Sequence, residues 1–351
     1  MHQLSPYIGK IKSVIAHDLI LKYSKPNDLI VDPFSGSGTI PLEAALLKRR
    51  VFACDASPYA SVLTKAKLFP PDSLEAALMN AESVLNKIAK LPDPDLRKVP
   101  LWVRKFFHPD TLKETIKAVD ICIKGHNTFL LSCILGILHH QRPGFLSYPS
   151  SHLVPYLRDK KYPRVKYPEL YEYRPLRTRL ISKIERAFRR NELNAHNGNV
   201  IYRQGKIENI KLPDIFDCLI TSPPYMNALD YNRDNRLRLW FINRRCENSI
   251  DQQLMGSKRA FELSITKLVK KVEKSLIIKG YCIFIVGEYL NHSPGKHPSQ
   301  VVQNIVSEHA PSLELLNIMT DGIPDVRRSR RNCRDIKTEH FLIFQRLKYA
   351  I

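Results

Sequence analysis

Apolar residues in the N-terminal part of the chain follow first a helical and then a strand spacing. The predicted elements are, in order, a helix at 11–23, a strand at 29–31, a helix at 41–50 and a strand at 51–54. Each strand ends on an acid, Asp32 and Asp55, and a loop of small residues follows Asp32. Strand, glycine loop, helix, strand and acid in this order indicate the opening of a doubly wound nucleotide-binding sheet.

The alternation of strands and helices then stops. Helical patterns cover 74–90 and 111–138, a tract rich in Pro, Tyr and Arg covers 141–180, and a basic helix is expected at 181–190. A crossover between parallel strands needs only about a dozen residues. We therefore expect residues 70–196 to form an inserted helical or irregular region with a task of its own, target recognition.

Strand and helix patterns alternate again in the C-terminal part. Strands are predicted at 200–202, 216–220, 281–287, 313–319 and 340–345, and helices at 229–242, 258–278 and 299–309. Residues 1–69 and 197–351 together predict one α/β domain, a mostly parallel sheet with helices on both faces.

Composition narrows the classes of partner. The chain has 351 residues, 44% of them hydrophobic, and its 55 Lys and Arg against 34 Asp and Glu give a formal net charge of +21. So large a cationic surplus favours a polyanionic partner, because Lys and Arg displace condensed counterions from phosphate backbones. A basic protein without such a partner is the plainer alternative.

Cysteine spacing and hydropathy argue against several other classes. The seven cysteines include no CxxC pair, which argues against a disulfide framework and a zinc site. His139 and His140 have no Cys or carboxylate at ligand spacing, so we expect no metal. No uninterrupted run of about 18 apolar residues occurs, and no signal-peptide run opens the chain. We expect a cytoplasmic protein without a membrane partner.

The loop after the first strand reads VDPFSGSGT, residues 31–39. Glycines at 36 and 38 allow close approach of a ligand to the backbone, next to the free N–H groups of the following helix. A Walker loop would need a Lys after Gly38, and a dinucleotide fingerprint would need glycine where Pro41 stands. The acid before the loop suits a cationic amino-acid nucleoside, and Asp55 can accept hydrogen bonds from ribose hydroxyls.

The strand predicted at 216–220 leads directly into Thr221 and then Ser-Pro-Pro-Tyr at 222–225. Two prolines fix the backbone and remove two N–H donors, which leaves acceptor carbonyls in place. A hydroxyl and a carbonyl can both accept from one NH₂ group, and Tyr225 offers a face on which a base can stack. A proline-stiffened loop without chemistry is the alternative.

Together the two motifs resemble those of the amino-group DNA methyltransferases of restriction-modification and related systems. DPFSGSGT is similar to their cofactor motif, TSPPY to the serine form of their catalytic motif, and SPYIGK near the N-terminus to a further cofactor motif. The resemblance implies a Rossmann-like class I methyltransferase fold with a seven-stranded sheet, and S-adenosylmethionine as cofactor.

The resemblance also implies roles for individual residues. The implied cofactor contacts are Tyr7, Asp32, Pro33, Phe34, Gly36, Ser37, Gly38, Thr39, Asp55 and Ala56. The implied catalytic residues are Ser222, Pro223, Pro224 and Tyr225. The reaction would be a direct methyl transfer from the sulfonium to the exocyclic amine of a base flipped out of the double helix.

Two basic segments are candidates for contact with double-stranded DNA. Between Arg158 and Arg190, 12 Lys and Arg stand against 4 Asp and Glu and are interleaved with tyrosines, and residues 327–334 contain five arginines. The expected phosphate contacts are Arg174, Arg177, Arg179, Arg327, Arg328, Arg330 and Arg331. A solvated helix face is the alternative for the first segment.

Three questions stay open at this point. The serine form of the motif favours cytosine N4, and adenine N6 is the main alternative target. A methyltransferase that acts on structured RNA would share the cofactor motif and the charge. A non-catalytic DNA-binding protein on the same fold would be expected to have lost TSPPY or the glycines, and both are intact. A cognate restriction or defence nuclease is a further candidate partner.

Overall fold

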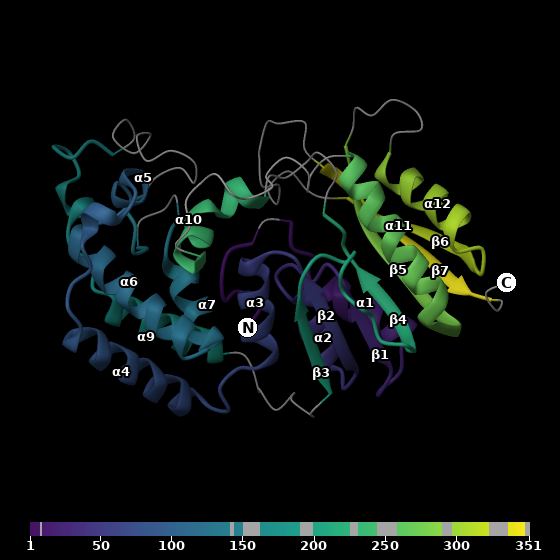
Figure 1. Cartoon of the computed structure of the whole chain (residues 1–351), viewed down its shortest axis with the longest axis horizontal. Helices are drawn as coiled ribbons and strands as arrows, with labels where there is room; N and C mark the ends of the chain where they lie inside the picture. Colours follow the sequence, from purple (N-terminus) through teal and green to yellow (C-terminus); the bar gives the residue numbers. More distant parts are fainter. Residues whose placement is uncertain are drawn as a thin grey trace. The chain divides into compact units, whose positions relative to one another are not determined.

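The computed structural model describes nine stretches of the chain, drawn in colour in Figure 1, and the chain divides into two compact units. The described residues are 1–7, 9–140, 144–149, 162–189, 199–224, 231–243, 258–289, 297–322 and 336–347. The first unit, here the sheet unit, comprises Tyr7–Thr64, Ala195–Asp230 and Ser249–Ile351. The second, here the helical unit, comprises Met1–Pro6, Lys65–Asn194 and Tyr231–Asn248.

A seven-stranded sheet in the order β3-β2-β1-β4-β5-β7-β6 forms the centre of the sheet unit. The strands are β1 (Leu29–Asp32), β2 (Arg50–Asp55), β3 (Val200–Gln204), β4 (Phe216–Thr221), β5 (Leu276–Tyr289), β6 (Leu313–Gly322) and β7 (Ile336–Arg346). β1 to β5 pair in parallel, and β7 runs antiparallel to both of its neighbours, β5 and β6. The predicted α/β fold with a mostly parallel sheet is confirmed.

Helices cover both faces of this sheet. They are α1 (Ser13–Tyr23), α2 (Thr39–Leu46), the first part of α3 (Pro58–Leu68), α11 (Lys258–Ser275) and α12 (Pro298–His309). α11 and α12 lie side by side (Figure 1) and bury one face in an apolar cluster that includes Val31, Phe216 and Phe284. α1 and α2 pack against β1, β2 and β4, where the alternate strand residue Ile30 is fully buried. Because helices cover both faces of the sheet, successive strand residues are buried on alternate faces, and the strands are therefore continuous apolar runs in the sequence.

The chain reverses its direction of winding between β1 and β4. β1 pairs with β2 on one side and with β4 on the other, with Val31 beside Leu219. Open α/β sheets bind their ligands in the crevice at the carboxyl ends of the strands where the order reverses. Both motifs identified in the sequence follow the carboxyl ends of these two strands.

The helical unit contains the helices that do not pack on the sheet. They are α4 (Leu74–Lys90), α5 (Leu101–Arg104), α6 (Pro109–Lys124), α7 (Thr128–Ile137), α9 (Leu176–Phe188) and α10 (Tyr231–Asn243), with short 3-10 turns at Leu96–Lys98 and Pro168–Tyr171. Most of the predicted insertion, 70–196, falls in this unit, which also takes in α10 from later in the chain.

Two helices, α6 and α7, occupy the stretch 111–138 for which the sequence predicted helical structure. α6 ends at Gly125, whose N–H bonds to the carbonyl of Ile121, and His126 has a positive φ of 53°. The Asn127 side chain then accepts a hydrogen bond from the N–H of Leu130 and caps α7. His126 therefore takes the left-handed position that Gly or Asn usually occupies after a helix, and asparagine is a preferred N-cap for the helix that follows.

Candidate active site

The glycine loop between β1 and α2 turns sharply on two left-handed residues. Gly36 and Gly38 have φ values of +49° and +73°, and the N–H of Gly38 bonds to the carbonyl of Ser35 at 2.7 Å. A Cβ at Gly38 would lie 2.8 Å from Oγ1 and 2.9 Å from Cα of Thr64 in α3. A Cβ at Gly36 would lie 3.3 Å from Cε1 of Tyr7. Both positions therefore require glycine, Gly38 because the backbone of α3 lies directly against it.

Tyr7 and a set of buried hydroxyls support this loop. The ring of Tyr7 lies beside Gly36 and 5.9 Å from the ring of Tyr59. The Thr64 hydroxyl lies 3.3 Å from Oγ of Ser35 and donates to the carbonyl of Gly36 at 3.3 Å. Thr64 is absent from the sequence prediction, and no sequence pattern identifies it because it lies on a different helix.

Ser37 and Thr39, at the entrance to α2, are buried, with their hydroxyl oxygens 3.1 Å apart. Pro33 is buried and its carbonyl accepts from the Cys54 thiol at 3.4 Å. Phe34 is partly buried and packs against the apolar cluster under α11 and α12. The predicted cofactor residues of the loop therefore include groups that hold its shape.

Asp55, at the end of β2, binds the same loop. Its Oδ2 accepts from the N–H of Gly36 at 2.8 Å, and its Oδ1 accepts from the N–H of Ser57 at 2.8 Å. Burial raises the pKa of Asp55 to about 6 against these hydrogen bonds and that from the N–H of half-buried Ala56. Each carboxylate oxygen has a second lone pair, which suits a ligand with two adjacent hydroxyls.

Asp32, at the end of β1, is 1% exposed. Its Oδ1 accepts a 2.7 Å hydrogen bond from Oγ1 of Thr221, the last residue of β4, and a 3.3 Å bond from the N–H of Phe34. Burial raises the pKa of Asp32 to about 7; the two hydrogen bonds oppose this shift and the nearby charge of Asp55 adds to it. The cofactor strand and the strand of the catalytic motif are thus joined by a buried side-chain bond.

These groups fit S-adenosylmethionine. Two carboxylates at the ends of adjacent strands suit a ligand with positive charge and ribose hydroxyls. The glycine positions, which a Cβ would fill, leave the loop backbone open to a closely packed ligand.

The proposed amine-binding residues begin one residue beyond Thr221. Pro223 is buried, and Ser222 and Pro224 are half-buried. Tyr225, predicted to stack on the base, lies outside the described residues. Cys54 and Cys218 are core thiols of β2 and β4 whose pKa values burial raises strongly, so neither is available as a thiolate nucleophile.

The predicted DNA-contacting arginines in and just before α9 have different surroundings. Arg174 is 6% exposed, and its guanidinium donates to the carbonyls of Phe145, Ser147 and Leu170 at 2.8, 2.6 and 2.8 Å. It therefore joins backbone segments and is not free to bind phosphate.

The next two arginines are also engaged within the helical unit. Arg177 is exposed and pairs with Glu82 of α4 at 2.5 Å. Arg179 is half-buried and donates to the carbonyl of Pro175 at 3.4 Å. Arg327, Arg328, Arg330 and Arg331 lie outside the described residues.

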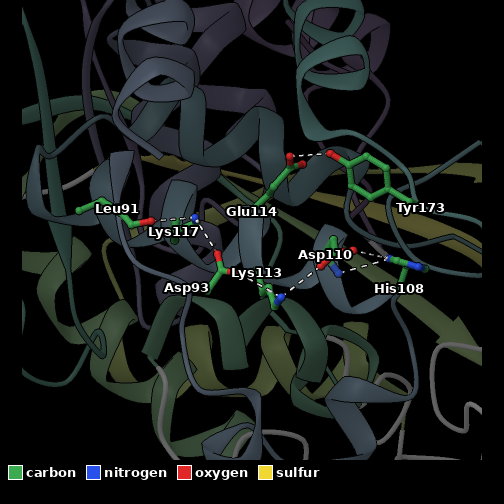
Figure 2. A network of polar contacts seen from close by, with 8 residues as sticks. All are labelled: Leu91, Asp93, His108, Asp110, Lys113, Glu114, Lys117 and Tyr173. Atoms are coloured by element: carbon green, nitrogen blue, oxygen red, sulfur yellow. Dashed lines mark hydrogen bonds and ion pairs between the residues drawn. The ribbon is translucent and has the colours of Figure 1, made fainter. Parts of the chain in front are cut away.

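A network of polar contacts around α6 pairs further lysines with acids (Figure 2), and its Glu114 also binds the start of α9. Lys113 and Lys117 pair with Asp93 at 3.0 and 3.1 Å, and Lys113 also pairs with Asp110. Glu114 accepts from the Tyr173 hydroxyl at 2.6 Å and from the N–H of Leu176, where no residue of α9 supplies a cap. The nearby acids offset the positive charge of these lysines, so the local field attracts phosphate less than that of cations without acidic neighbours.

Exposed cations free of acidic partners within the described helical unit occur on the turn 162–167. The N–H groups of Lys166 and Tyr167 bond to the carbonyl of Pro163 at 3.0 and 2.9 Å. The Arg164 guanidinium lies 4.6 Å from the centre of the Tyr171 ring and the Lys166 ammonium 5.7 Å from that of Tyr167. This turn combines cations with aromatic rings, as the sequence predicted for the segment 158–190.

Within the described residues, no group of three or more His, Cys, Asp and Glu side chains could hold a metal ion. Among those same residues, no helix is both long and apolar enough to cross a membrane.

Comparison with known proteins identifies the relatives of the chain. A DNA methylase family model matches residues 13–65, which contain the glycine loop and Asp55. The chain is 24% identical to Type II methyltransferase M.MvaI of Kocuria varians over 86% of its own length, and it spans 66% of that protein.

Two solved structures are similar over nearly the whole chain. TrmN from Thermus thermophilus matches with a TM-score of 0.40 and 11% identity, over 97% of this chain and 50% of TrmN. A SAM-dependent methyltransferase from Methanosarcina mazei matches with a TM-score of 0.38 and 10% identity, over 94% of this chain and 97% of that one.

The family match and the curated relative confirm the predicted resemblance to the amino-group DNA methyltransferases. Together with the fold, this family implies S-adenosylmethionine as the cofactor, as expected from the sequence.

Proposed function

We propose that this protein transfers the methyl group of S-adenosylmethionine to the exocyclic amino group of a base in double-stranded DNA, with cytosine N4 as the favoured target. The observation that carries this proposal is the pairing of β1 with β4. This pairing brings the glycine loop and Ser222-Pro223-Pro224 to the ends of two adjacent strands, joined by the bond between Thr221 and Asp32.

The bound cofactor would supply an electrophilic methyl group on its sulfonium. Asp32, Asp55 and the glycine loop would hold its charge, its ribose and its chain next to the amine site. The Ser222 hydroxyl and the rigid carbonyls beside Pro223 and Pro224 would accept hydrogen bonds from the two amine N–H groups and direct the nitrogen lone pair toward the methyl carbon. The methylated amine would then lose one proton, to Ser222 or to water. The residues therefore act by position and electrostatics, without a covalent intermediate on the protein.

A base inside a duplex cannot reach such a site, because its amino group is paired and its ring is stacked. The target base would be flipped out, with Tyr225 as the expected stacking surface. The net charge of +21 and the relative that is a type II methyltransferase support DNA as the polyanion. Adenine N6 is the main alternative target, and an RNA base is the less favoured one.

Mass spectrometry of nucleosides distinguishes these targets. Genomic DNA and total RNA from cells that express the protein, or its Ser222→Ala variant, are digested and analysed. We expect N4-methylcytosine in DNA with the wild-type protein and its near absence with Ser222→Ala. N6-methyladenine would move the assignment to adenine, methylated bases only in RNA would reject DNA, and no difference from Ser222→Ala would reject the assigned site.

We further propose that the helical unit contacts the DNA backbone through the turn 162–167. Replacing Arg164 and Lys166 with Gln should weaken binding to every duplex and reduce the slope of log K against log salt by about 1.8, which is about 0.9 per phosphate contact. The matched control replaces Lys113 and Lys117 with Gln, since these cations already pair with acids. Equal slopes in both double variants would rule out this turn as the contact.

A further inference from the structure

We propose that Thr221 is a positioning residue: its hydroxyl orients the buried Asp32 carboxylate toward the cofactor cation and ties the end of β4, from which Ser222 and Pro223 continue, to β1. This inference rests on the proposed function. It assigns a role to a residue for which the sequence motifs gave none.

The geometry of the pair supports this role. Thr221 is fully buried, Asp32 is 1% exposed, and their side-chain oxygens lie 2.7 Å apart, although 189 residues separate them in the chain. The bond engages Oδ1 of Asp32, which also accepts from the N–H of Phe34 at 3.3 Å. Two donors on one oxygen fix the plane of the carboxylate, so that its second oxygen is held in a defined direction.

The same bond restrains the catalytic motif. Thr221 ends β4, and Ser222 and Pro223 follow at once. Its side chain is attached to β1, whereas its backbone continues into the loop. A displacement of Asp32 would therefore also move the start of the loop that carries Ser222, so the geometry of the cofactor site and that of the amine site would be coupled through this bond.

The bond also bears on the charge of Asp32. Among the described residues, the titratable groups that interact with Asp32 are Asp55 and Cys54, both from β2, while β4 contributes the non-titratable Thr221. Burial and Asp55 raise the pKa of Asp32 to about 7, and the Thr221 hydroxyl acts in the opposite direction. Asp32 needs its negative charge to attract a cation, so loss of the hydroxyl should shift cofactor binding toward higher pH.

The test compares Thr221→Val, which keeps the shape, with Thr221→Ser, which keeps the hydroxyl. Titration calorimetry gives S-adenosylmethionine affinity between pH 5.5 and 9, and carboxyl ¹³C NMR follows the ionisation of Asp32 in the cofactor-free protein. For Thr221→Val we expect both midpoints to rise by about one pH unit, and at least tenfold weaker binding near neutral pH. Thr221→Ser should stay close to wild type in both measurements.

The chain offers a matched control in the same unit. Ser312 donates to Glu273 at 2.7 Å, both side chains are buried, and Ser312 immediately precedes β6. Ser312→Ala removes an equivalent buried bond and should leave both midpoints unchanged. Wild-type midpoints in Thr221→Val, or equal shifts in Ser312→Ala, would overturn the proposal.

Failure of the proposed function has a different signature. In that case, the wild-type protein binds S-adenosylmethionine with the expected pH midpoints but methylates no DNA. The NMR titration of Asp32 tests the role of Thr221 independently of methylation, because it follows the ionisation of Asp32 in the cofactor-free protein.

Discussion

Replacing Gly38 with alanine tests whether the glycine loop is shaped by α3 or only by its own turn. The added Cβ would meet Oγ1 of Thr64 at 2.8 Å and Cα of Thr64 at 2.9 Å, in a residue whose φ is +73°. The left-handed conformation costs an L-residue about 1–2 kcal/mol. Forcing a methyl group into a packed interior costs about 1–3 kcal/mol more.

The expected loss for Gly38→Ala is therefore about 2–5 kcal/mol. It should divide between the free energy of unfolding and the affinity for S-adenosylmethionine, because the loop can relieve the clash only by moving away from its native position. Urea unfolding measures the first quantity and titration calorimetry the second. Their sum is the quantity to compare with the expected loss.

Gly36→Ala is the internal comparison. Its φ is +49°, but its Cβ would meet only the edge of the Tyr7 ring, at 3.3 Å. A side chain can move by a few tenths of an ångström, so the strain term of about 1–2 kcal/mol should dominate. The Thr64→Ala change should not rescue Gly38→Ala, because the Cα atom remains in place. If Gly38→Ala costs no more than Gly36→Ala, or if Thr64→Ala restores it, the close approach of α3 does not determine the loop.

Three further predictions follow from buried polar groups. Burial raises the pKa of Asp32 to about 7, so between about pH 4 and pH 7 the folded protein holds a proton that the unfolded chain has lost, and the free energy of unfolding should fall as the pH rises through this range. Urea unfolding at several pH values should show a weaker pH dependence for Asp32→Asn than for the wild-type protein. An unchanged dependence would contradict the raised pKa of Asp32. Asp55→Ala should weaken S-adenosylmethionine binding by about 1–3 kcal/mol, since charged hydrogen bonds to the loop and to ribose are lost, and unchanged affinity in calorimetry would count against this site. Arg174→Met should lower stability by about 2 kcal/mol or more because buried carbonyls lose their donors, while the salt dependence of DNA binding stays the same; a flatter salt slope would mean that Arg174 contacts phosphate after all.

Local patterns in the sequence determined most of the fold. The predicted strand ends at Asp32 and Asp55 coincide with the ends of β1 and β2, and the predicted helix 74–90 coincides with α4. These elements depend on hydrophobic periodicity and turn residues over a few positions, which the chain carries locally. The predicted helical stretch 111–138 is helical as well, but its apolar periodicity did not show where α6 ends and α7 begins, near Gly125.

The motif residues were also predictable, because each motif is contiguous in the chain. What the motifs could not indicate is which partners their side chains would find. The Asp55 carboxylate bonds to the N–H groups of Gly36 and Ser57, although the sequence predicted only a contact with ribose.

Only the tertiary structure decided the remaining features of the site. Thr64 lies against Gly38, Thr221 binds Asp32, and Arg174 is buried among carbonyls. Each relation joins residues from different elements, so it depends on how helices and strands pack and not on spacing within one segment. The sequence of a basic stretch does not show which of its arginines face solvent and which are buried. The charge of the segment therefore predicted a polyanionic partner, while the fold determined which of its arginines are free to meet one.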